Sequence, residues 1–107
     1  MSEIWERIKR CIEEENVNVS SHGYDELAAD GLFAGEIVSS VEIAVVIEAY
    51  PEYPKGPCVL VFQQDSDGEP VHVVWGIPRG EDGPAVLVTA YRPDPEKWSD
   101  DFLRRAE

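Results

Sequence analysis

Two histidines and two hydroxyl residues are the side chains of this sequence best suited to acid–base chemistry. His72 lies in the apolar run Pro70–Ile77, and Thr89 and Tyr91 lie two residues apart in the run Ala85–Arg92. Residues two apart in a strand share a face, so Thr89 and Tyr91 can share one with His72 if the runs are neighbouring strands in register. A buried histidine is more often held by a local hydrogen bond than catalytic, and threonine and tyrosine are common packing residues of sheets. A structural role for all three therefore stays open.

His22 is a second candidate because it falls in the first turn of a helix expected after Ser20 or Ser21. The positive end of a helix dipole disfavours a protonated imidazole, so His22 could act as a general base. The plainer interpretation is a surface residue that helps to cap the helix. Lys55 and Arg79 lie in the loop sequences Pro-Lys-Gly and Pro-Arg-Gly. They are candidates for binding a phosphate or a carboxylate, or else solvated loop charges.

We expect neither a metal site nor a cofactor. His22 and His72 are far apart in the sequence and belong to no motif with metal-ligand spacing. The sequence contains no glycine-rich phosphate loop, no nucleophile elbow and no Cys-x-x-Cys. Cys11 and Cys58 have apolar or helical neighbours, which predicts reduced and buried thiols.

Charge restricts the class of partner. The 107 residues include 22 acidic and 9 basic ones, for a formal net charge of −13. Phosphate backbones repel an anionic chain, so RNA binding is disfavoured and a basic protein partner is favoured. We also expect a cytoplasmic protein without a membrane partner. The first residues resemble no signal peptide, and no apolar run approaches the roughly 20 residues of a membrane helix.

Hydrophobic periodicity predicts one α+β domain over residues 1–107, with N-terminal helices, a four-stranded antiparallel sheet and a C-terminal helix. Apolar spacing predicts a first helix within residues 1–15, capped by Ser2, and a helical pair within residues 20–41 that is interrupted at Gly31. Residues 16–19 are expected to be a short connector. An antiparallel meander is expected over residues 43–92, and a helix capped by Asp94 over residues 94–106. The expected strands are Ile43–Tyr50, Cys58–Gln64, Val71–Ile77 and Ala85–Arg92.

Several of these segments, taken in order from Ser20 to Arg105, resemble the domain of unknown function 4258 family. The segments that carry the resemblance are His22 with Asp25-Glu26-Leu27, Glu48-Ala49-Tyr50-Pro51, Pro70-Val71-His72-Val73-Val74, Val88-Thr89-Ala90-Tyr91 and Pro93-Asp94-Pro95-Glu96-Lys97-Trp98. The resemblance implies the small bacterial toxin fold of the RelE and barnase-like ribonucleases, and a zinc-finger antitoxin as partner. It also implies that His22, His72, Thr89 and Tyr91 occupy the polar positions of the family.

Two functional hypotheses follow. The first is an mRNA-cleaving toxin of a toxin–antitoxin module, acting as a metal-independent endoribonuclease. In it His22 is the base, His72 with Tyr91 is the acid, and Lys55 or Arg79 binds the phosphate. The alternative is a non-catalytic acidic interaction protein of the same fold that binds a basic protein partner. A homodimer through an exposed sheet edge is compatible with both.

The position of the positive charges distinguishes the two hypotheses. An enzyme requires Lys55, Arg79 and Arg92 to lie near His22 and His72, where they could bind the phosphate of a substrate. Acidic side chains around the same histidines would instead favour the interaction protein.

Overall fold

A five-stranded sheet in the order β1-β5-β4-β3-β2 forms the centre of the computed structural model, which describes residues 3–105. The helices are α1 (Glu3–Glu13), α2 (Ser21–Ala29) and α3 (Ala34–Ser39), followed by a 3₁₀ turn at Val41–Ile43. The strands are β1 (Val17–Val19), β2 (Val45–Tyr50), β3 (Cys58–Gln64), β4 (Pro70–Gly76) and β5 (Ala85–Tyr91). The α+β class is therefore confirmed. The expected cap at Ser2 and residue 106 of the expected last helix lie outside the described residues.

The expectation of a four-stranded, purely antiparallel sheet is wrong in one respect. Strands β2 to β5 do form the predicted antiparallel meander, but β1 adds a fifth strand that runs parallel to β5. Its three residues are too few to produce a recognisable alternation. The strand forms because β5 offers a free edge: the amide of Ala85 donates to the carbonyl of Asn16 (2.9 Å), and the amide of Ser20 donates to that of Leu87 (3.1 Å).

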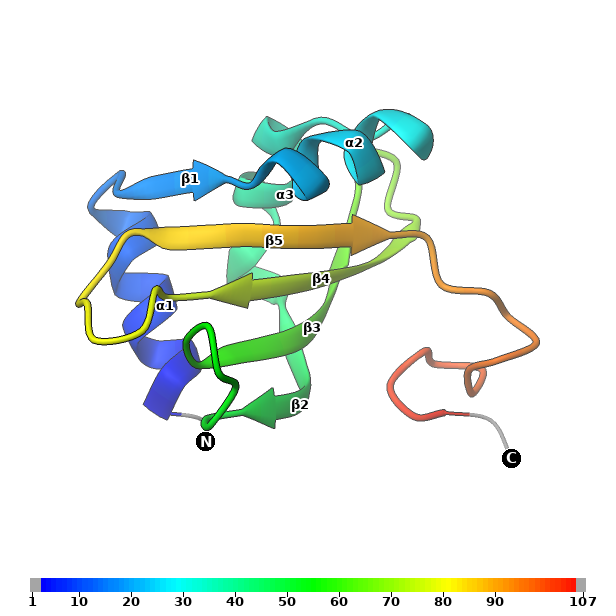
Figure 1. Ribbon diagram of the computed structural model, residues 1–107. Coiled ribbons are helices and arrows are strands. Elements are labelled where there is room, and N and C mark those ends of the chain that lie inside the picture. Colours follow the sequence, from blue (N-terminus) through cyan, green and yellow to red (C-terminus); the bar gives the residue numbers. More distant parts are fainter. Residues whose placement is uncertain (1–2, 106–107) are drawn as a thin grey trace.

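The predicted central strand, β4, lies in the middle of this sheet. The apolar side chains on one of its faces, Val71, Val73 and Trp75, are all fully buried. They pack with α1 and α3, which lie behind the strands in Figure 1, while α2 lies along the β5 side of the sheet. The apolar side chains that alternate along the strands and those that recur every three or four residues on the helices thus pack in one core.

The second helix begins and ends where its sequence predicts. Ser20 is the N-cap, and its hydroxyl accepts from the amide of Gly23 at 2.9 Å. At the other end Gly31 has the predicted left-handed backbone, with φ of 67°. Gly23 also allows α2 to approach the sheet, since a β-carbon there would lie 2.7 Å from the carbonyl oxygen of Leu87. The third helix ends at Ser39 rather than at the expected Val41.

The expected C-terminal helix is absent from the described residues. Residues 93–105, here called the strap, form turns and one isolated bridge between Trp98 and Arg105. Short polar side chains satisfy the local backbone: the Asp94 carboxylate accepts from Glu96, and the Asp101 carboxylate accepts from the Leu103 amide. Such bonds stabilise turns in competition with a helix.

One buried polar side chain joins the sheet to the helical layer. Gln63 is fully buried, and its Nε2 donates to the carbonyl of Ile37 at 2.6 Å and to the hydroxyl of Ser40 at 2.8 Å. Its Oε1 accepts from the indole nitrogen of Trp75 at 2.7 Å. The amide therefore fixes both the end of α3 and the largest side chain of the core.

Replacing this amide should destabilise the fold. Gln63→Leu preserves the approximate volume but leaves the buried Trp75 N–H without an acceptor, at a cost of about 2–3 kcal/mol. Gln64→Leu, at the half-buried next position, should cost less than about 0.5 kcal/mol. Urea unfolding followed by tryptophan fluorescence measures both variants. Equal unfolding midpoints for the two would contradict a structural role for the amide.

Candidate functional site

The sheet face opposite α1 carries most of the polar side chains of the strands. Register pairs His72 with both Phe62 and Tyr91, and it pairs Val74 with Thr89. It also brings two residues of β2 to this side, because Glu48 pairs with Leu60 and Tyr50 with Cys58. We call this surface the His72 face. Its members used below are Glu48, Tyr50, Phe62, His72, Thr89 and Tyr91.

His72 is fully buried in this face, and both of its ring nitrogens have partners. Nε2 lies 2.7 Å from the carbonyl oxygen of Phe102 in the strap, and Nδ1 lies 3.3 Å from the hydroxyl of Tyr91. A carbonyl can only accept, so Nε2 carries the hydrogen and Nδ1 accepts from Tyr91. The ring of Trp98 packs edge-on against the imidazole, with centroids 4.3 Å apart. No ring nitrogen of His72 remains for a substrate while the strap is in place.

The surroundings favour the neutral form of this histidine. Burial is the main cause that lowers the pKa of His72; the bond to Phe102 opposes it, and the positive charge of Arg105 adds to it. Burial likewise raises the pKa of the Tyr91 hydroxyl. A neutral imidazole beside a protonated phenol agrees with the hydrogen-bond assignment above.

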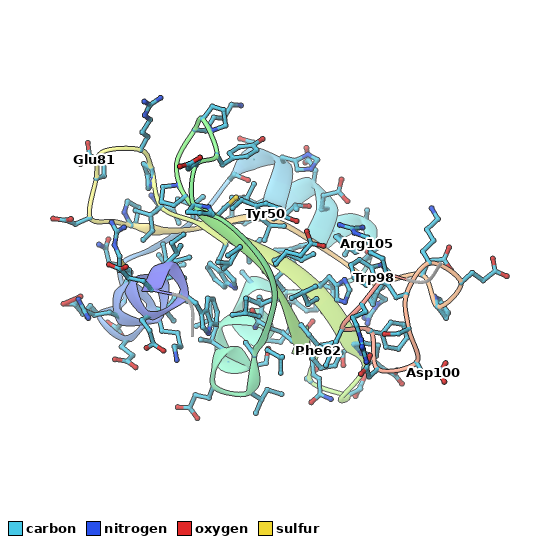
Figure 2. The ribbon with its side chains drawn as sticks, turned by 90° about the horizontal axis from the view of Figure 1, so that it is seen from below. Tyr50, Phe62, Glu81, Trp98, Asp100 and Arg105 are labelled. Carbon is cyan, nitrogen blue, oxygen red and sulfur yellow. The ribbon has the colours of Figure 1, made fainter. Side chains whose placement is uncertain are left out.

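A carboxylate and an aromatic ring on the same face hold a guanidinium group. Arg105 Nε lies 3.3 Å from Glu48 Oε1, and the guanidinium carbon lies 4.9 Å from the centroid of the Trp98 ring. The other carboxylate oxygen, Glu48 Oε2, accepts from the Tyr50 hydroxyl at 2.6 Å. Burial, followed by this bond to Glu48, raises the pKa of Tyr50. Figure 2 shows Arg105 and Trp98 side by side where the strap meets the strands, and we call this group the Glu48–Arg105 site.

The other predicted site residues lie elsewhere. Lys55 and Arg79 are neighbours, because the Arg79 amide donates to the Lys55 carbonyl at 3.1 Å, but their loops lie beyond the Cys58–Gly76 end of the sheet. Figure 2 places Glu81, in the same loop as Arg79, far from Asp100 of the strap. The arrangement of sequence motifs did not reveal this separation.

His22 makes its contact on another element than His72. It lies on the surface of α2, where its Nε2 is 3.6 Å from Glu26 Oε1. Among residues 3–105, no hydrogen bond or ion pair joins the two histidines. Arg92 binds Asp65 at 2.9 Å instead, at the turn between β3 and β4. Of the predicted residues, only Thr89 and Tyr91 share the sheet face of His72, and Lys55 and Arg79 neighbour each other beyond the end of the sheet.

The surroundings of the two cysteines are those of packed thiols. Cys11 and Cys58 are both buried and unbridged, as predicted. The Cys11 thiol lies 3.3 Å from the carbonyl of Asp82, and burial raises the pKa of Cys58. In the described part of the chain, no three His, Cys, Asp or Glu side chains are grouped so that they could hold a metal ion. Nor does any helix there have the length and apolar character needed to cross a membrane.

Sequence reasoning missed the residues of the Glu48–Arg105 site. Glu48 and Tyr50 are two apart in a strand, which was a signal that they share a face. Trp98, which lies in the segment expected to be the last helix, is instead buried against His72 and forms a bridge with Arg105. Nothing local in the sequence indicates that Arg105 returns to Glu48.

These features define an α+β protein with a mixed five-stranded sheet, whose polar face is covered by an irregular strap. The chain belongs to the DUF4258 family, described as a domain of unknown function, whose model matches residues 19–92. No curated protein and no solved structure matches the chain significantly. The matched residues include the whole His72 face, whereas α1 and the strap lie outside them.

The neutral state of His72 predicts a pH dependence of stability. Because folding lowers the pKa of His72, the unfolded chain binds a proton more readily than the folded protein does. The contribution of neutral His72 to the free energy of unfolding is therefore complete above the ordinary pKa of 6.5, and it is lost as pH falls from there through the pKa of the folded state. Thermal unfolding should therefore show a loss of stability below pH 6.5. The carboxyl groups with lowered pKa values, such as Glu36, lose their contribution only below about 4.5.

Two variants isolate this effect. His72→Gln should flatten the change of melting temperature between pH 6.5 and 4.5, whereas His22→Gln removes an exposed imidazole and should retain it. An unchanged slope in the His72 variant would contradict the assignment.

Proposed function

We propose that this protein is a non-catalytic interaction protein that binds a basic protein partner. The observation that carries the proposal is the state of His72: its two ring nitrogens are both used inside the protein, beneath the strap. Lys55 and Arg79 lie at the other end of the sheet, and Arg92 is paired with Asp65. None of these three cations, which were candidates for binding a phosphate, is therefore free beside His72.

Charge supports a basic partner. The net charge is −13, and Lys9, Arg92 and Arg105 pair with the carboxylates of Glu6, Asp65 and Glu48. The field around the molecule is consequently negative, which speeds encounter with positively charged proteins and repels nucleic acid. The strands contribute an acid, Glu48, to the His72 face, and the positive charge that acts on His72, Arg105, is already paired with this acid.

Affinity capture tests this function directly. The tagged protein, used at physiological salt, should retain a basic protein whose purified form binds it in calorimetry, with an affinity that falls steeply as salt is added. A synthetic single-stranded RNA should not bind under the same conditions. Tighter binding of the RNA than of any captured protein would overturn the proposal.

A second function is favoured by the chemistry of the His72 face. A carboxylate (Glu48), an imidazole (His72) and a phenol (Tyr91), with Thr89 beside them, include the general base and acid that RNA cleavage needs. We propose as the second candidate a metal-independent, mRNA-cleaving toxin of the RelE-like fold, held by a zinc-finger antitoxin. Its activity would require the strap to move, so that Nε2 of His72 is released from Phe102.

Induced expression in bacteria separates the two candidates. An interaction protein should permit normal growth with abundant folded protein. Growth arrest by the wild-type chain that disappears in a His72→Gln variant, shown by thermal denaturation to be folded, would instead establish the toxin. His22→Gln is the matched control, because His22 is an exposed side chain of α2 that pairs with Glu26.

A further inference from the structure

The Glu48–Arg105 site has the composition of a receptor for a guanidinium group. Guanidinium groups bind carboxylates through planar N–H groups and stack on aromatic rings, and an arginine is recognised best where both are present. Here Glu48 supplies the carboxylate and Trp98 the ring. The site is filled by a side chain of the same molecule, Arg105.

Trp98 and Glu48, which line this site, are held more firmly than Arg105, which fills it. Trp98 is only 6% exposed and packs against the buried His72 ring. Glu48 is oriented by the short hydrogen bond from Tyr50, which leaves its other oxygen facing Arg105. The Arg105 side chain, in contrast, is 62% exposed; it meets Glu48 through Nε, lies over the Trp98 ring and interacts with the Tyr50 hydroxyl. An exposed ion pair of this kind contributes little stability and exchanges readily.

We propose that this site binds an arginine side chain of the basic partner, and that Arg105 occupies it as an internal competitor. The inference rests on the proposed interaction function, because it specifies where such a partner binds and by which residue. A tethered side chain competes at a high effective concentration, so it lowers the apparent affinity for any arginine from outside. A partner must therefore displace Arg105 to bind.

The guanidinium of Arg105 can be removed while Glu48 and Trp98, which line the site, are kept. In Arg105→Gln the guanidinium is lost, while the backbone bridge to Trp98 does not depend on the side chain. Arg104→Gln is the matched control: it makes the same change of charge one residue away, at an exposed position whose backbone bonds with Ser99 and whose charge acts on Asp101. The probe is the tripeptide acetyl-Gly-Arg-Gly-amide, and its citrulline analogue is the uncharged comparison.

Calorimetric titration should show tighter binding of the arginine peptide to Arg105→Gln than to the wild type or to Arg104→Gln. We expect an increase of about three- to fivefold, since an exposed pair is only modestly populated. The citrulline peptide should not bind. Equal affinities of the two arginine variants for the arginine peptide would overturn the proposal.

The carboxylate provides a second test. Adding Glu48→Gln to Arg105→Gln should abolish binding of the peptide, whereas adding Glu52→Gln, at an exposed turn position, should not. Nuclear magnetic resonance of the Arg105→Gln protein provides a measurement that does not depend on the folding of the Glu48 variant. The peptide should shift the Trp98 indole and Tyr50 ring signals, and their failure to move would overturn the site.

Failure of the site and failure of the proposed function give different results. Because the tripeptide needs no partner, binding at Glu48 without capture of any basic protein would leave the site intact and reject the function. If a captured basic protein binds the wild type and the Glu48→Gln variant equally, the interaction function stands and the site is rejected.

Discussion

A buried imidazole in the central strand is the constraint on which the polar side of this protein depends. His72 has no access to water, so both of its nitrogens need partners within the protein. Tyr91 provides one across the sheet, and the carbonyl of Phe102 provides the other from the strap. The second bond holds the strap on the sheet, packs Trp98 against the imidazole, and places Arg105 beside Glu48.

The opposite face of the sheet is organised by a similar device. Gln63 on β3 is fully buried and bonds to the end of α3 and to Trp75. Each face thus has one polar side chain that specifies what covers it, where apolar contacts alone would allow more than one arrangement. The sheet lies within the residues matched by the DUF4258 family model except for part of β1, whereas α1 and the strap, which cover its two faces, lie outside them.

This arrangement changes how the polar residues are interpreted. His72 and Tyr91 suggest acid–base chemistry when they are considered as residue types, yet together with the strap they form a closed, neutral group. Beside this group, the half-exposed Glu48 carboxylate and the Trp98 ring hold Arg105, and that pairing of groups recognises positive charge. The negative charge of the whole chain favours the same class of partner.

The sequence by itself determined the α+β class, the antiparallel strands β2 to β5, the central position of β4 and the left-handed Gly31 that follows α2. Periodicity and backbone preference, on which these features depend, are local properties. Register also placed Thr89 and Tyr91 beside His72, as the spacing suggested. Only the tertiary structure decided the pairing of β1, the path of the strap and the separation of Lys55 and Arg79 from the histidines. Those features depend on contacts between segments far apart in the chain, for which neighbouring residues carry no signal.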